Sequence, residues 1–267
     1  MSDETTRAQP PAVFEPGPTV SELYPEVAAG GFTRLDGTVE FYTRVNALID
    51  ADSRVLDFGA GRGWWEHHAS PLMHYRLRRF RGRVKEVVGV DVDEAIRENP
   101  GLDSAYVIPM DPLELPLPDE HFDLVLADYV LEHVAQEDAK TVVDEIGRVL
   151  KPGGWFAART PNKWGIIGIG ARAVPNRLHT RVLARLQPGR PAGDVFPTRY
   201  AMNTRRALRR QFPEPDWHVY VYGWTSEPRY MGSSKLAWRI AGFIDRLTPQ
   251  PLAATLMIFV QKAADPT

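Results

Sequence analysis

Short apolar runs alternate with helix-like segments along the first 160 residues of the chain. The runs lie at 54–58, 87–91, 105–108, 122–127 and 155–159. Before the last run, residues 136–150 have helical spacing and end at the sequence KPGG, residues 151–154. Continuous apolar runs of this length are typical of strands that are covered on both faces. The pattern therefore predicts an α/β domain with a parallel sheet between two layers of helices.

The remaining segments complete this architecture. Helical spacing predicts one helix before the sheet, at 38–50, and two later helices at 204–211 and 234–247. Two further strands are predicted at 218–222 and 255–262. Together with the five runs, they predict a doubly wound, mostly parallel seven-stranded sheet with helices on both faces and an antiparallel last strand.

The chain of 267 residues is long enough for one large α/β domain. Residues 1–30 are proline-rich with little periodicity, and we expect them to form a loose N-terminal arm. Residues 31–267 then form a single domain. It carries two inserts, at about 163–205 and 224–247, which we expect to cap the substrate.

Composition excludes several classes of chemistry. The chain has no cysteine, which rules out disulfides, thiolate metal sites and a cysteine nucleophile. No cluster of histidines and acids has metal-ligand spacing, so we expect no metal. The N-terminal sequence MSDETTRAQPP is acidic and proline-rich, unlike a secretory signal. We therefore expect a soluble, cytoplasmic protein.

A glycine-rich turn follows the first strand, in the sequence VLDFGAGRG at 55–63. Glycines at 59, 61 and 63 allow positive φ angles and close approach of a ligand to the backbone. Such a ligand should lie at the carboxyl ends of the strands. A tight strand-to-helix turn also needs glycine, so glycine content alone does not distinguish a cofactor-binding loop from a structural turn. The spacing of the glycines is the discriminating feature. A dinucleotide fingerprint, G-x-G-x-x-G, would require glycine where the chain has Trp64.

The observed spacing, D-x-G-x-G-x-G, resembles motif I of the class I S-adenosylmethionine-dependent methyltransferases. Two later segments, LPLPDEHFDLVLA at 115–127 and LKPGGW at 150–155, resemble later motifs of the same family in the same order. The resemblance covers residues 38–160 and points to the group that methylates small molecules. It implies a Rossmann-like fold, an enzyme, and S-adenosylmethionine as the cofactor.

The resemblance also implies how the cofactor is held. Asp91, at the end of the second strand, would accept hydrogen bonds from the ribose hydroxyls. Asp111 would face the adenine amino group, and Asp128 would line the methionine end. An acid at a strand end can instead cap a helix or form a turn. The expected contacts are Asp57, Gly59, Ala60, Gly61, Gly63, Asp91, Val92, Met110, Asp111 and Asp128.

Transfer to a hydroxyl would also require a general base. His133 follows the fourth strand and can face the pocket, although packing beside the next helix is the commoner role for such a histidine. His179 lies in the segment that should cap the substrate. We take these two histidines as the candidate catalytic residues.

One region is strongly basic. Residues 163–210 hold ten arginines and one lysine against a single acid. Arg177, Arg181 and Arg185 recur every four residues and would form a stripe on one helix face. The stripe is either a solvated helix face, a surface for anionic substrate or lipid headgroups, or a nucleic-acid surface. The whole-chain pI of about 6.4 makes nucleic acid unlikely as a partner.

A second basic amphipathic stretch lies near the C-terminus. Trp238, Ile240, Phe243 and Ile244 are flanked there by Lys235, Arg239 and Arg246. Two such stretches favour an anionic, lipid-linked or amphiphilic acceptor. They also favour peripheral membrane contact, made through Arg177, Arg181 and Arg185.

We therefore predict a methyltransferase that methylates a small or amphiphilic molecule at oxygen, such as a glycan, glycolipid or secondary metabolite. The acceptor could instead be a quinone-like carbon or nucleic acid. Two other classes stay open, a nicotinamide-dependent oxidoreductase and a non-catalytic protein that binds S-adenosylmethionine. The sequence does not indicate the oligomeric state.

Overall fold

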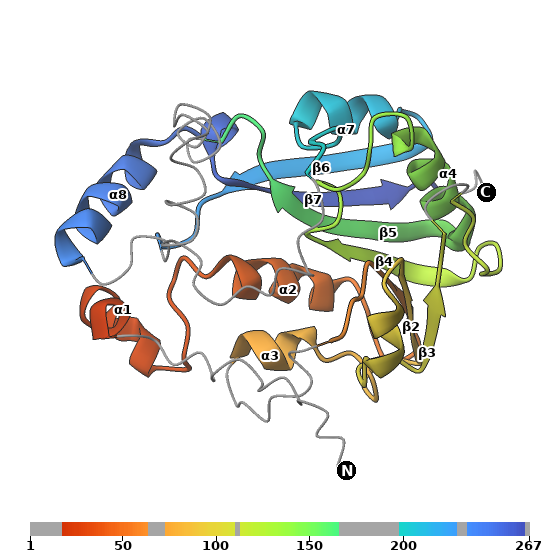
Figure 1. Ribbon diagram of the computed structural model, residues 1–267, viewed down its shortest axis with the longest axis horizontal. Coiled ribbons are helices and arrows are strands. Elements are labelled where there is room, and N and C mark those ends of the chain that lie inside the picture. Colours follow the sequence, from red (N-terminus) through yellow and green to blue (C-terminus); the bar gives the residue numbers. More distant parts are fainter. Residues whose placement is uncertain (1–17, 64–72, 110–112, 166–197, 229–233, 265–267) are drawn as a thin grey trace, which may run out of the picture.

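The computed structural model describes residues 18–63, 73–109, 113–165, 198–228 and 234–264. Seven strands form one sheet in the order β3-β2-β1-β4-β5-β7-β6 (Figure 1). They are β1 (Arg54–Phe58), β2 (Glu86–Asp91), β3 (Ser104–Val107), β4 (Phe122–Asp128), β5 (Leu150–Pro161), β6 (Trp217–Trp224) and β7 (Thr255–Lys262). The first five strands pair in parallel, whereas β7 is antiparallel to both β5 and β6. The predicted fold class is confirmed, including the antiparallel last strand.

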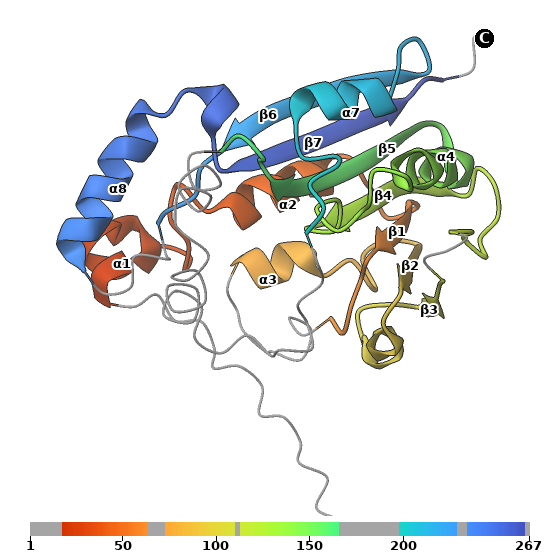
Figure 2. The same cartoon turned by 45° about the horizontal axis from the view of Figure 1, so that its top comes forward.

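Helices cover both faces of this sheet (Figure 2). They include α2 (Gly37–Ala47) and α3 (Met73–Arg78) on one face, and α4 (Ala139–Val149) and α7 (Arg205–Gln211) on the other. Neighbouring residues of β1 serve the two layers. Val55 is buried with Phe41 and Val45 of α2, and Leu56 is buried with Ile146 of α4. This explains why the strand is continuously apolar, since each face has its own core.

The direction in which the chain adds strands to the sheet reverses between β1 and β4. From β1 the chain moves outward to β2 and β3, and then returns to β4 on the other side of β1. A parallel sheet that reverses direction in this way leaves an opening at the carboxyl ends of its central strands. Both Asp57 of β1 and Asp128 of β4 lie at this edge.

The expected loose arm over residues 1–30 is wrong for its second half. Residues 18–28 form α1 (Pro18–Leu23) and the 3-10 helix η1 (Pro25–Ala28). Val20, Tyr24 and Val27 bury their side chains against Trp238 of α8 (Lys235–Leu247). Their spacing of four and three residues is helical, but the surrounding prolines masked it. Residues 1–17 lie outside the described part.

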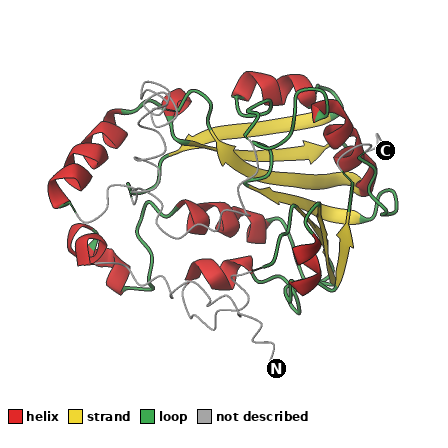
Figure 3. Cartoon of the chain, viewed as in Figure 1, coloured by secondary structure: helices red, strands yellow, loops and turns green. Residues whose placement is uncertain are grey.

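The two expected inserts are described unequally. The second contains α8, which packs beside α1 at the end of the molecule away from β3 (Figure 3). Two further 3-10 helices, η2 (Glu94–Glu98) and η5 (Gln250–Leu252), connect elements of the main domain. Most of the first insert lies outside the described residues, and with it His179 and the stripe of Arg177, Arg181 and Arg185.

Candidate functional site

The turn after β1 leaves one of its three glycines facing open space. Gly59, Gly61 and Gly63 have φ angles of 81°, 52° and 59°, a region that favours glycine. A Cβ atom on Gly59 would lie 2.4 Å from Val130, and one on Gly63 would lie 2.0 Å from the side-chain oxygen of Asn99. Among the described residues, no atom beyond its chain neighbours lies within 4 Å of the same position on Gly61. The backbone is therefore open to a ligand at Gly61.

Asp91, the last residue of β2, holds this turn in place. Its Oδ2 accepts a hydrogen bond from the Gly61 amide at 2.8 Å, and its Oδ1 accepts one from the Asp93 amide at 2.9 Å. On the other side, the Asn99 side-chain amide donates to the carbonyls of Ala60 and Gly61 at 3.2 and 3.1 Å. A carboxylate has about four lone-pair positions, so Asp91 retains capacity for a ligand's hydroxyls. The structure thus brings Asp91 and the turn together.

The other residues expected around the turn have mixed surroundings. Ala60 is buried in the core, and its amide donates to the carbonyl of Val90 at 3.2 Å. Val92 is half-buried and packs against the core on the other side of the sheet. Met110 and Asp111 lie outside the described residues.

Asp57, in β1 directly before this turn, has a raised pKa. Burial raises the pKa of its carboxyl to about 7, the negative charges of Asp128 and Asp91 add to this rise, and Arg78 opposes it. A carboxyl with such a pKa exchanges its proton near neutral pH, and a cation beside it would lower that pKa. Perturbed groups of this kind are typical of functional sites.

Asp128 ends β4 inside a network of buried cations. Its carboxylate accepts hydrogen bonds from Arg159 Nε at 2.5 Å, from Arg78 at 3.2 Å and from the Tyr42 hydroxyl at 2.9 Å. Burial alone would raise the pKa of Asp128, but the charges of Arg159 and Arg78 outweigh it and lower the pKa. Arg159, on β5, is only 4% exposed and also donates to the Thr38 hydroxyl at 3.0 Å. This network orients the start of α2 against the sheet edge.

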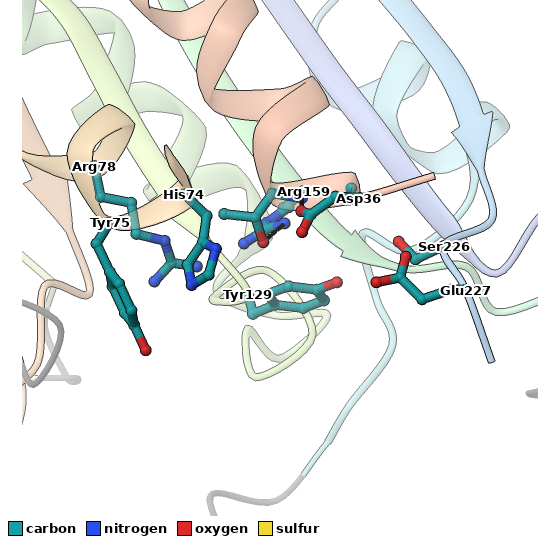
Figure 4. A pocket seen from close by; sticks show the side chains of 10 residues that line it. Asp36, His74, Tyr75, Arg78, Tyr129, Arg159, Ser226 and Glu227 are labelled. Atoms are coloured by element: carbon teal, nitrogen blue, oxygen red, sulfur yellow. Dashed lines mark hydrogen bonds between the residues drawn. The ribbon is translucent and has the colours of Figure 1, made fainter. Parts of the chain in front are cut away.

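A pocket of about 390 Å³ opens beside the network. Its lining residues are Asp36, Gly37, Thr38, His74, Tyr75, Arg78, Tyr129, Arg159, Ser226 and Glu227. Figure 4 shows His74 and Arg78 of α3 on one side and Ser226 and Glu227 on the other, with Tyr129 between them. The lining carries charges of both signs, so the pocket suits a polar group rather than a purely apolar one.

The expected base His133 is not among the described residues that line this pocket. His133 is half-buried, and its backbone amide donates to Val130. Among the described residues, the histidine that lines the pocket is His74, which no sequence motif indicates. It lies on a helix of six residues, too short to give a clear periodic signal.

Known proteins match the central part of the chain. Residues 56–158 match the family model described as "Methyltransferase domain". That range contains the glycine turn, Asp91 and Asp128. It runs from β1 to β5 and so covers the parallel part of the sheet. Residues 56–158 therefore form a class I, Rossmann-like, S-adenosylmethionine-dependent methyltransferase domain, and S-adenosylmethionine is the cofactor of that family.

Two curated relatives are similar over this part. The 2-phytyl-1,4-naphtoquinone methyltransferase of Synechococcus elongatus is 36% identical over 108 residues, which are 38% of this chain and 42% of that protein. A protein of Mycolicibacterium smegmatis named "Probable S-adenosylmethionine-dependent methyltransferase" is 39% identical over 135 residues, 48% of this chain and 46% of its own. The chain thus spans less than half the length of either relative.

A solved structure shares the fold. The S-adenosylmethionine-dependent methyltransferase from Methanosarcina mazei superposes with a TM-score of 0.51 at 17% identity. The alignment covers 83% of this chain and 98% of that one. This likeness concerns the arrangement of the sheet and helices alone.

Proposed function

We propose that the protein is a methyltransferase that uses S-adenosylmethionine to methylate a small or amphiphilic acceptor at an oxygen atom. The observation that carries this proposal is the open face of Gly61 beside Asp91, at the carboxyl ends of β1 and β2. Asp91 and Asn99 fix the backbone of the turn from both sides, so the cradle exists before a ligand enters. Preorganisation of this kind reduces the cost of binding.

The residues present fit the cofactor's functional groups. Asp91 would accept the ribose hydroxyls with its remaining lone pairs, and Gly61 would lie against the nucleoside without a side chain in the way. Asp57 would favour the positive charges of the methionine end. When bound, S-adenosylmethionine supplies a methyl group that its sulfonium charge already activates.

We assign the role of general base to His74, which lines the pocket. A hydroxyl acceptor would give its proton to the imidazole as the new C–O bond forms and the S–CH₃ bond breaks. The products are a methyl ether, S-adenosylhomocysteine and a protonated histidine. Histidine is the side chain that most often serves as a general base in enzymes. Arg78 and Glu227, with charges of opposite sign, would orient polar groups of the acceptor.

A quinone-like carbon is the second candidate acceptor. It is favoured by the naphthoquinone in the name of one relative. The two candidates differ in the bond formed. Fragmentation of the product by mass spectrometry, with the methyl group isotopically labelled, would place the label on oxygen or on carbon.

Calorimetry tests the cofactor half of the proposal. The wild-type chain should bind S-adenosylmethionine, and Asp91→Asn should weaken binding by about 2 kcal/mol, the scale of a hydrogen bond to a charged group. Asp144→Asn is the matched control, because Asp144 is an exposed acid on α4. Absence of binding by the folded wild type, or equal affinities in both variants, would contradict the proposed site.

Steady-state kinetics tests the base. His74→Gln should lower kcat with a hydroxyl acceptor by roughly a hundredfold and leave cofactor affinity unchanged, because general bases contribute about that much or more. His133→Gln serves as the control and should retain kcat. The opposite ranking of the two variants would return the role of base to His133.

A further inference from the structure

The outward face of α8 is apolar. Ten large apolar side chains are more than a third exposed among the described residues, and five of them lie on this one helix. They are Leu236, Ile240, Phe243, Ile244 and Leu247, with exposed fractions of 69%, 52%, 63%, 43% and 68%. Their spacing of four, three, one and three residues places all five on one side of the helix. We call this set the outer stripe.

The opposite side of α8 already has a partner. Trp238 and Ala241 are 3% and 4% exposed, and Trp238 packs against Val20, Tyr24 and Val27 of the N-terminal helices. Tyr24 and Trp238 meet edge to face with 6.1 Å between ring centroids. The outer stripe is therefore not needed to hold α8 in place, and its exposure calls for another explanation.

Cations accompany the outer stripe. Lys235, Arg239 and Arg246 are exposed, and their spacing of four and seven residues puts them along one flank of the stripe. Lys235 also pairs with Glu22 of α1, whereas the single acid of α8, Asp245, is half-buried. An apolar face with a basic flank is complementary to a bilayer surface, with acyl chains beneath and phosphates beside them.

We propose that the outer stripe of α8 docks on the surface of an anionic lipid bilayer, with the helix lying in the plane of the interface. No helix in the described ranges is long and apolar enough to cross a bilayer, so contact through α8 would be one-sided. A second copy of the chain fits less well. A symmetric contact through this face would bring the two basic flanks together without any compensating acids.

The docked helix would hold the pocket near the bilayer. Glu227 of the pocket lies eight residues before Lys235 in the sequence. On the other side, Leu35 packs against the cluster of α1, η1 and Trp238 and directly precedes the pocket residue Asp36. Figure 2 shows α1 and α8 together at one end of the molecule, beside the start of α2. An amphiphilic acceptor, as in the proposed function, could then present its polar end while its apolar part stays in the bilayer.

Vesicle flotation of the full chain tests the docking. Vesicles that contain phosphatidylglycerol should carry the protein upward, and vesicles of phosphatidylcholine alone should carry much less. The double variant Ile240→Ser with Phe243→Ser should lower the partition coefficient by roughly tenfold per side chain. Arg239→Gln with Arg246→Gln should lower the partition coefficient by about fivefold per charge. Added salt should likewise weaken the binding of the wild type to anionic vesicles.

Matched controls separate the outer stripe from general stickiness. Tyr220→Ser removes a side chain that is 54% exposed on β6, and Arg209→Gln with Arg210→Gln removes two exposed charges on α7. Both controls should bind like the wild type. Absence of binding by the wild type, or equal binding by the outer-stripe variant, would overturn the docking. So would a dimer, detected by light scattering, that the outer-stripe variant dissociates.

The same variants distinguish this proposal from the proposed function. In calorimetry, the double variant Ile240→Ser with Phe243→Ser should bind S-adenosylmethionine with unchanged affinity. Its unfolding temperature should match those of the control variants. Loss of vesicle binding with intact cofactor binding supports docking through α8. Vesicle binding by a chain that does not bind the cofactor would leave the docking supported and reject the methyltransferase function.

Discussion

The cofactor cradle and the acceptor pocket are built in different ways. The cradle comes from one short stretch, 57–63, braced by Asp91 and Asn99, and backbone groups make most of its contacts. The pocket collects side chains from positions 36 to 227 and depends on the buried pair of Arg159 and Asp128. Substitutions should therefore harm the cradle through shape and the pocket through charge balance. Three sets of variants test this contrast.

The largest effect should come from Arg159→Met, which tests charge balance. Arg159 is 4% exposed, and its removal leaves Asp128 with only Arg78 and Tyr42 as partners. Breaking a buried ion pair from one side costs about 3–5 kcal/mol, so we expect a loss of about 3 kcal/mol in the free energy of unfolding. Urea denaturation measures it. Arg97→Met removes a pair in which Arg97 is 64% exposed, and its cost should stay below about 1 kcal/mol.

Equal losses in these two arginine variants would contradict the view that the buried pair supports the pocket. The comparison would be sharpened further by acceptor kinetics. Arg159→Met should alter KM for the acceptor more than affinity for the cofactor, because Arg159 lines the pocket and does not contact the glycine turn.

The same contrast explains what the sequence could predict. The cradle was predictable because its residues are contiguous and each has a local reason, such as positive φ at Gly59 or a carboxylate at the end of β2. The seven strands were predictable because each face of the sheet has its own core, which makes the strands continuously apolar. Their pairing order needed the family resemblance or the structure.

The pocket was not predictable in this way. His74 and Arg159 line the same pocket only because α3 and β5 converge at the sheet edge, and nothing in the local sequence marks either residue. His133 was the natural choice by position, since it follows β4, but the chain turns at Val130 and keeps it out of the pocket lining. The helical spacing of Val20, Tyr24 and Val27 was present in the sequence but obscured by proline.

The second effect should separate the glycines of the cradle. Gly59→Ala places a Cβ 2.4 Å from Val130 at a φ of 81°, so overpacking and backbone strain should together cost about 2–3 kcal/mol of stability. Gly61→Ala meets no atom of the described residues and should cost about 1 kcal/mol from its φ of 52° alone. Its methyl group would nevertheless fill the open face.

Gly61→Ala should therefore lose more cofactor affinity than stability, and Gly59→Ala the reverse. Thermal unfolding together with calorimetry on both variants measures the two effects. Normal binding of S-adenosylmethionine by Gly61→Ala would show that the open face of the turn is not where the cofactor lies.

The smallest effect concerns Asp57, which belongs to the cradle and whose pKa depends on burial and on neighbouring charges. Burial raises the folded-state pKa to about 7 from its ordinary value of 3.8, so the folded chain holds this proton more tightly than the unfolded chain. The stabilisation is complete below a pH of about 4 and is lost as the pH rises toward about 7. Asp57→Asn removes this dependence. Above pH 7 the free energy of unfolding of Asp57→Asn should exceed that of the wild type by up to about 2 kcal/mol, and at low pH the two free energies should converge. The figure of about 2 kcal/mol takes the partial exposure of the side chain into account.

Proton release on cofactor binding checks the same residue independently. A cation placed beside Asp57 lowers its pKa, so binding of S-adenosylmethionine below pH 7 should release part of a proton. The binding enthalpy of the wild type should then vary with the ionisation enthalpy of the buffer, and that of Asp57→Asn should vary less. Asp144→Asn, which removes an exposed acid, should behave like the wild type. If all three chains show the same buffer dependence, Asp57 does not meet the cofactor's charge, and the positive end must lie against another acid of the sheet edge.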